Sequence, residues 1–206
     1  MTFQALEIGP RQIFQPGEIA LQSGDLAEAE RALLSPDGNL VVGYFRSQNE
    51  GGYKAVRIWN LTTAQTTQFQ TEIYQEWKFS SDSRLLALTA ITDGGKVNER
   101  SVAEIWDVQN GMRLMTIDVP SEWRGAYAVA VSPDSKLVAV GGYEKFGLFS
   151  IETGKLLVSE THHSTGFFQD SEMPNHLSHV EFSPDGKLLL TSGNDSTVKL
   201  WRMTRS

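Results

Sequence analysis

The chain has 206 residues, of which 18 are basic and 25 acidic, so its formal net charge is −7. That balance argues against a dedicated nucleic-acid binder, which usually carries a net basic surface. Cysteine is absent, which excludes disulfides, thiolate catalysis and cysteine-based metal sites. The first residues contain no basic leader, and no apolar run is long enough to span a bilayer. We therefore expect a cytoplasmic protein.

The predicted elements begin with residues 1–27, which contain two short strand candidates, at residues 3–7 and 11–15. One pattern then occurs four times, at residues 28–70, 71–117, 124–159 and 176–206. Each copy can bury its apolar faces only against neighbouring copies. We therefore expect one domain, residues 1–206.

Each copy has an alternating segment, a turn with a serine, an apolar run and a segment that ends in an aromatic residue. The turn serines are Ser35, Ser80, Ser132 and Ser183, and the closing aromatic residues are Trp59, Trp106, Phe149 and Trp201. The serines are 45, 52 and 51 residues apart. This period is typical of repeats that contain several short strands.

The fourth copy shows how each unit divides into strands. Residues 178–182 alternate apolar and polar side chains, as a half-buried strand does. Residues 183–186, Ser-Pro-Asp-Gly, predict a turn, because proline sets φ, aspartate bonds locally and glycine accepts positive φ. Two further strands follow, at residues 188–191 and 197–201. Earlier copies add a fourth strand after a tight turn, so the sequence predicts four antiparallel strands per unit.

Three segments carry a resemblance to a known family. They are the Ser-Pro-Asp-Gly turn at 183–186, the segment Gly-Asn-Asp-Ser-Thr-Val-Lys-Leu-Trp at 193–201, and Trp106-Asp107. Together they resemble the WD-repeat family, over residues 28–203. The resemblance implies an all-β fold: a β-propeller of four-stranded antiparallel WD-type blades, here about four of them.

In that family a histidine, a serine or threonine, an aspartate and the closing tryptophan form a hydrogen-bonded structural tetrad. Carried over to the fourth copy, the resemblance implies His163, Ser192, Asp195 and Trp201, with His176 as an alternative to His163. The other copies have no histidine in the matching segment. We therefore expect packing, rather than the tetrad, to stabilise those blades.

The closure of the ring stays open at this point, because four blades are few for a propeller. An open arc or fragment of a larger propeller, a dimer that completes an eight-bladed ring, and a compact ring of four or five blades all fit the sequence. In a closed ring, a strand from residues 1–27 could complete the fourth blade. An open arc would expose edge strands and apolar faces, which drive association.

The lengths of the connections predict which face binds a partner. Turns between first and second strands are short, whereas insertions fall at residues 46–54, 91–101 and 163–177. Antiparallel strands put these insertions on one face of the disc, and long loops on a rigid scaffold are common binding sites. Solvated insertions without a partner are the competing interpretation.

Five side chains in or near these connections are candidates for partner binding. Phe167 and Phe168 are candidate aromatic anchors, and Arg46, Arg100 and Arg124 could contact an acidic ligand. Adjacent aromatic residues also pin loops onto a fold, and arginines are commonly solvated surface charges.

The four histidines, His162, His163, His176 and His179, lie close together in the sequence. Imidazoles suit a divalent metal, but this spacing matches no strong metal motif, so we expect neither a metal nor a cofactor. The sequence contains no nucleophile elbow and no phosphate-binding glycine loop. We therefore do not expect an enzyme.

The sequence thus predicts a non-catalytic scaffold for protein–protein interaction, which binds a protein or peptide on the face with the insertions. The alternative is a propeller segment that completes or accompanies an enzyme domain or a larger propeller by oligomerisation. A homodimer or an association with further blades would fit this alternative. We expect no nucleic-acid and no membrane partner.

Overall fold

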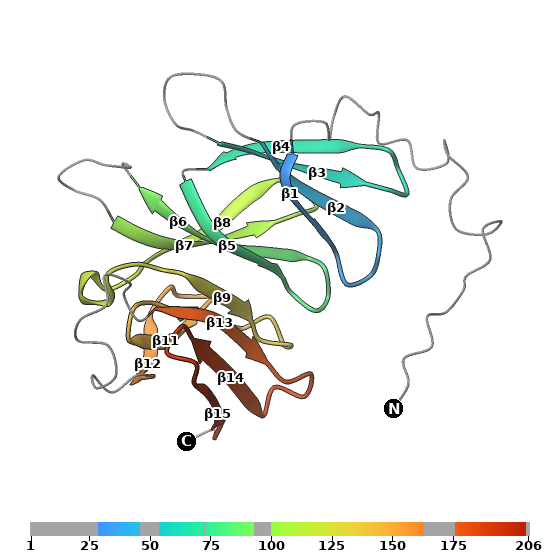
Figure 1. Cartoon of the computed structure of the whole chain (residues 1–206). Coiled ribbons are helices and arrows are strands. Elements are labelled where there is room, and N and C mark those ends of the chain that lie inside the picture. The colour runs from blue at the N-terminus through green and yellow to red at the C-terminus, as the bar shows by residue number, and fades with distance from the viewer. Residues whose placement is uncertain (1–28, 46–53, 72, 93–99, 163–175, 205–206) are drawn as a thin grey trace, which may run out of the picture.

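The computed structural model describes residues 29–45, 54–71, 73–92, 100–162 and 176–204 (Figure 1). These residues form fifteen strands in four antiparallel sheets, which follow one another along the chain. They also form one short 3-10 helix, η1 (Ser121–Trp123). No helix in this described part has the length and apolar character needed to cross a membrane. The predicted all-β fold with about four blade-like units is confirmed.

We call the sheets blades 1 to 4, in chain order. Blade 1 contains β1 (Ala29–Leu34), β2 (Leu40–Phe45), β3 (Lys54–Asn60) and β4 (Thr66–Thr71). Blade 2 contains β5 (Ile73–Phe79), β6 (Leu85–Thr92), β7 (Arg100–Asp107) and β8 (Met112–Asp118). Blade 3 contains β9 (Ala128–Val131), β10 (Leu137–Gly141), β11 (Lys145–Ser150) and β12 (Leu156–Thr161). Blade 4 contains three described strands, β13 (Leu177–Phe182), β14 (Leu188–Gly193) and β15 (Val198–Arg202).

The serine-containing turns have the same hydrogen bonds in every blade. In blade 1 the Ser35 hydroxyl donates to Asp37 at 2.5 Å and accepts from the Leu40 N–H at 2.9 Å. The same two bonds recur at Ser80, Ser132 and Ser183. Each turn therefore fixes the pairing register of the first two strands of its blade, and that register decides which side chains face the neighbouring blades.

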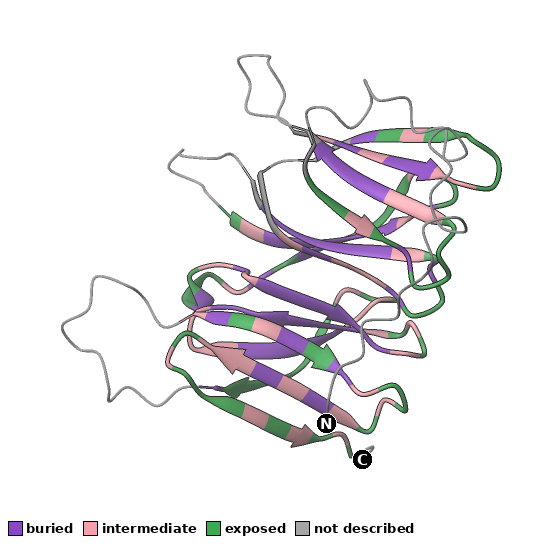
Figure 2. Cartoon of the chain, turned by 45° about the vertical axis from the view of Figure 1, so that its right-hand side comes forward, coloured by how far each residue is buried: buried purple, intermediate pink, exposed green. Residues whose placement is uncertain are grey.

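Consecutive blades pack face to face through three apolar clusters. The leading face of each blade carries the closing aromatic residue, and in blades 2 to 4 this face contacts the preceding blade. The opposite, trailing face contacts the next blade in blades 1 to 3. Between blades 3 and 4, Phe146 and Leu148 of the trailing face pack in one cluster with Phe182 and Trp201 of the leading face. The ring centroids of Phe146 and Trp201 are 4.9 Å apart. The core is therefore a series of seams between blades (Figure 2).

The first strands of the blades lie side by side along one edge of the stack. β9 contacts both β5 and β13, and Arg31 of β1 pairs with Glu76 of β5 at 3.8 Å. Blades 1 and 4 lie at opposite ends of this stack (Figures 1 and 2). Because the strands alternate in direction, connections after second and fourth strands leave from one face, which we call the loop face. Turns after first and third strands form the opposite turn face.

Candidate functional site

The loop face is the one on which the sequence places its insertions. Most of those residues, including Arg46, Phe167 and Phe168, lie outside the described residues, so their predicted role in partner binding stays a prediction. Two other candidates are described, Arg100 at the start of β7 and Arg124 after η1. Both are exposed, and both lie on the loop face. Arg100 pairs there with Asp118, at 3.0 Å.

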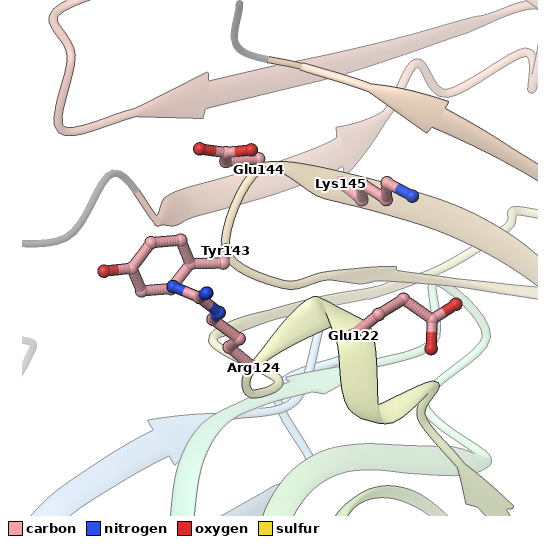
Figure 3. Close-up of a pocket in the computed structure, with 5 residues that line it drawn as sticks. All are labelled: Glu122, Arg124, Tyr143, Glu144 and Lys145. Carbon is pink, nitrogen blue, oxygen red and sulfur yellow. The ribbon is translucent and has the colours of Figure 1, made fainter. Parts of the chain in front are cut away.

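A pocket of about 180 Å³ opens on the loop face at blade 3 (Figure 3). Its walls come from the connection between blades 2 and 3 and from the turn between β10 and β11. The lining residues are Glu122, Arg124, Tyr143, Glu144 and Lys145. Two cations, two carboxylates and a phenol thus surround one small depression.

The backbone holds Arg124 in a defined position within this pocket. Arg124 has the left-handed conformation, with φ 51° and ψ 29°, and its N–H donates to the Ser121 carbonyl at 3.0 Å. Its own carbonyl accepts from the Tyr127 hydroxyl, also at 3.0 Å. Its guanidinium carbon lies 5.6 Å from the centroid of the Tyr143 ring, within the range of a cation–π contact. The arginine is therefore oriented before any partner arrives.

Trp123 anchors both walls of the pocket to the core. Its side chain is fully buried and meets Phe149 edge to face, with ring centroids 5.9 Å apart. Its carbonyl accepts from the Tyr143 N–H at 2.8 Å, which joins η1 to the turn between β10 and β11. That turn approaches so closely that a Cβ on Gly142 would lie 2.8 Å from the Trp123 Cβ. The pocket is thus built on rigid structure.

The chemistry of this pocket suits the charged side chains of another polypeptide. Arg124 and Lys145 can pair with carboxylates, and Glu122 and Glu144 with a cation. Tyr143 adds a ring that is polar at one end, of the kind enriched in protein interfaces. The sequence interpretation named only Arg124. The sequence signal for Tyr143, Glu144 and Lys145 was the segment Gly142-Tyr143-Glu144-Lys145, which combines an aromatic residue and two charges in a tight turn.

In blade 4, hydrogen bonds link Trp201 to Thr191 and His162, each of which lies one residue before the residue expected from the sequence. The Trp201 indole N–H donates to the Thr191 hydroxyl at 2.7 Å, so Thr191 takes the role that the sequence gave to Ser192. The histidine is His162, whose Nδ1 is 2.7 Å from the same hydroxyl. His163 lies outside the described residues. Alternate residues of a strand face opposite sides, so Ser192 points to the trailing face of the blade, away from Trp201.

Two further contacts complete this network. His162 Nε2 lies 3.1 Å from the Thr197 hydroxyl, which donates to Asp195 at 2.7 Å. Trp201, Asp195 and His162 are thus linked through two threonine hydroxyls that the sequence interpretation did not name. His176, the alternative histidine, instead contacts Tyr127 and Asn194. The position of this network, in the seam between blades 3 and 4, indicates a role in stability.

Blade 2 has a different buried polar group at the matching place. Glu104 is buried in β7 and accepts from the Trp106 indole N–H at 2.9 Å and from Arg113 at 2.7 Å. Packing alone therefore does not stabilise this blade, contrary to the expectation from the missing histidine. The sequence signal was a glutamate two residues before the closing tryptophan of an apolar strand.

The described histidines do not gather around a metal. His162 belongs to the network above, and His179 contacts Glu181 at 3.0 Å. Within the residues that the structure describes, no group of three or more histidine, aspartate or glutamate side chains could hold a metal ion. His163 lies outside this part of the chain.

Consecutive antiparallel sheets, stacked through apolar faces and closed by an aromatic residue on the third strand, define a repeat protein of the propeller class. Residues 168–202, which include β13 to β15, match the family described as WD domain, G-beta repeat. This part of the chain is therefore similar to one repeat of the WD-repeat family. Protein groucho of Drosophila melanogaster is 26% identical to the chain over 154 residues, which are 73% of this chain. The match spans 20% of that relative's length.

Proposed function

We propose that this protein is a non-catalytic scaffold that binds a protein or peptide on its loop face. The pocket around Arg124 and Tyr143 carries this proposal, because it presents oriented charges on a rigid base on that face. The insertions at 46–54, 91–101 and 163–177 would extend the contact around it. The partner would bring a carboxylate to Arg124 and a basic group to Glu122 or Glu144.

The role of the buried polar groups supports a non-catalytic function. His162 is buried between blades 3 and 4, where the Thr191 hydroxyl joins it to Trp201, and the exposed Thr197 joins it to Asp195. The similarity of residues 168–202 to a WD repeat also favours an interaction scaffold. A cytoplasmic location and the lack of a nucleic-acid or membrane partner remain parts of this proposal, drawn from the charge and the apolar pattern of the sequence.

An affinity capture experiment with matched variants tests the loop face. The purified chain is immobilised, captured proteins are identified by mass spectrometry, and their affinities are then measured directly. Arg124→Ala and Tyr143→Ala should each weaken binding roughly tenfold or more, as the loss of an interface arginine or tyrosine often does. Lys136→Ala is the control, because Lys136 is exposed on the turn face of the same blade.

The variants separate this proposal from its competitors. If Arg124→Ala and Tyr143→Ala both bind as tightly as the original chain, the pocket is not the docking site. If Lys136→Ala weakens binding instead, the partner uses the turn face. Replacement of residues 46–53 by a short glycine-containing turn should also reduce capture without unfolding the chain.

A second candidate function is that of an array that completes a larger propeller, or accompanies an enzyme domain, by association of blades. Exposed apolar side chains at the two ends of the stack favour it, among them Leu34 in blade 1 and Leu200 in blade 4. In this function the end faces would bind, and the loop face would stay available.

A further inference from the structure

The turn between β7 and β8 contains Asn110-Gly111, the one place in the sequence where a glycine follows an asparagine. Asn110 is exposed, and Gly111 has φ 62°, a conformation that glycine adopts without strain. Because glycine has no Cβ, no side chain at Gly111 hinders contact between its backbone nitrogen and the Asn110 side chain. An asparagine in this position can react with the backbone that follows it.

The backbone N–H of Gly111 differs from its counterpart in blade 3. Gly154 ends the matching turn between β11 and β12, and its N–H donates to the Ser150 carbonyl at 2.8 Å. In the described part of the chain, no backbone hydrogen bond of this kind joins Gly111 to Asp107. A bonded N–H points at its acceptor and away from other groups. The Gly111 nitrogen is therefore the more available of the two.

The Asp107 carboxylate holds the Asn110 side chain in place. It accepts from the Asn110 backbone N–H at 3.1 Å and from the side-chain Nδ2 at 2.9 Å. The side chain therefore bends back over its own turn. Asn39 has the same kind of bond, from its Nδ2 to Asp37 at 2.9 Å, but Leu40 follows it. The two asparagines thus form a matched pair that differs in the next residue.

We propose that Asn110 is a site of spontaneous covalent modification, in which its side-chain amide is lost. The Gly111 nitrogen forms a bond to Asn110 Cγ, the bond from Cγ to Nδ2 breaks, and Nδ2 leaves as ammonia with the proton of the Gly111 N–H. Water then opens the resulting cyclic imide, a succinimide. Opening at Cγ gives aspartate, and opening at the main-chain carbonyl carbon gives isoaspartate. The two steps consume only water and need no oxidant or cofactor.

An aspartate at position 110 would face the Asp107 carboxylate. The amide that now donates to Asp107 would be replaced by a second carboxylate, and two like charges at hydrogen-bond distance repel each other. The reaction would thus remove a bond from the turn that follows β7 and add repulsion there.

An isoaspartate would disturb the seam between blades 1 and 2, because it adds a carbon to the main chain directly before Gly111. That glycine lies against blade 1, since a Cβ on it would be 2.3 Å from Thr67 Cγ2. The same seam contains the stacked rings of Phe69 and Trp106, whose centroids are 3.8 Å apart. The lengthened turn must shift against this packed surface. The turn belongs to the turn face, so the inference goes beyond the loop-face function and does not rest on it.

Peptide mapping by mass spectrometry, after incubation of the folded chain at mildly alkaline pH, tests the proposal. We expect the mass increase of one deamidation in the Asn110 peptide, with release of ammonia, and no change in the Asn39 peptide. A sample digested without incubation gives the background. Conversion should quicken as the pH rises, because the attacking nitrogen must lose its proton. Asn110→Gln should abolish conversion, since a glutamine would have to close a larger ring.

Two outcomes would overturn the proposal. One is conversion of Asn110 no faster than that of Asn39 in the folded chain. The other is conversion of Asn110 only in chain unfolded with urea, which would show that the folded turn protects it. Enzymatic methylation that is selective for isoaspartate distinguishes the two products, so that both openings of the ring are counted.

Asn110→Asp tests the consequence for stability. This variant should lower the urea midpoint of unfolding, because two carboxylates then meet in the turn. Asp107→Asn, added to it, exchanges the donor and the acceptor of the bond and should restore most of the loss. An unchanged midpoint for Asn110→Asp, or a double variant that is no more stable than the single one, would contradict the repulsion between the two carboxylates.

Discussion

The Trp201 indole N–H and the His162 imidazole meet at one hydroxyl, that of Thr191, at 2.7 Å each. Because the Thr197 hydroxyl donates to Asp195, it can only accept from His162 Nε2. Nε2 therefore carries a hydrogen, and in the neutral imidazole Nδ1 accepts the Thr191 hydrogen. Every donor in this chain of contacts then has an acceptor, which a buried polar network requires in order to stabilise a fold.

Thr191→Val should destabilise the protein much more than Ser192→Ala. Valine keeps the shape of threonine but removes the hydroxyl, so the buried His162 and the partly buried Trp201 lose a partner, at a cost of about 1–3 kcal/mol. Ser192 lies outside the network, and its replacement should change the free energy of unfolding by less than about 0.5 kcal/mol. Urea unfolding followed by tryptophan fluorescence measures both. Equal effects would contradict the assignment of Thr191.

Arg113→Ala should cost more stability than Arg100→Ala. Arg113 neutralises Glu104, whose side chain is buried, and its loss leaves a buried carboxylate without its cation. Because Arg113 is itself half exposed, we expect a loss of about 1–3 kcal/mol, below the value for a fully buried pair. Arg100 and Asp118 are both solvent-exposed, so that pair should contribute less than about 1 kcal/mol. A loss from Arg100→Ala as large as that from Arg113→Ala would contradict this ranking.

The turn face should make stability depend on pH in the acid range. Hydrogen bonds from the Ser35 hydroxyl and the Asn39 N–H lower the pKa of Asp37 from 3.8 to about 2. A lower pKa in the folded state means that the carboxylate stabilises the fold above pH 3.8. That contribution disappears as the pH falls from there to about 2. Asp37→Asn should flatten the decline of the urea midpoint in this window, and parallel profiles for both proteins would argue against it.

Gly147→Ala should destabilise blade 3, because no space exists for a methyl group. A Cβ at this position would lie 2.5 Å from the Trp123 ring and 2.7 Å from a Leu156 methyl. Overpacking of this kind costs about 1–3 kcal/mol. Combined with Trp123→Leu, the substitution should cost less than the sum of the two single variants, since a smaller side chain relieves the clash. Thermal unfolding of the four proteins measures this coupling, and strict additivity would show that the ring is not the obstacle.

The sequence predicted the strands of the fourth copy well, because the serine turn fixes their register. The expected strands at 178–182 and 188–191 correspond to β13 (Leu177–Phe182) and β14 (Leu188–Gly193). The sequence analysis named Ser192 as the partner of Trp201, whereas the structure has Thr191 there, and the reason is geometric. Both side chains can accept a hydrogen bond, and only the pairing register decides which one faces Trp201.

The pocket could not be predicted from the spacing of residues. Its walls, around Arg124 and around Tyr143, are separate in the sequence and meet because Trp123 is buried beneath both. No local pattern marks Trp123 as an anchor, since it lies in a connection and not in a repeat. Glu104 is a similar case, because its partner Arg113 comes from the next strand.

Leu200 in β15 has the same register from the serine turn as Leu148 in β11, which packs against blade 4. A duplicated blade inserted after blade 4 would therefore meet an apolar surface, with Val198 in the place of Phe146. Gene duplication can lengthen such an array with few compensating substitutions, because each unit contacts only its neighbours. Ancestral or laboratory-made versions with more or fewer units should consequently remain foldable, and the number of units would set the number of binding surfaces.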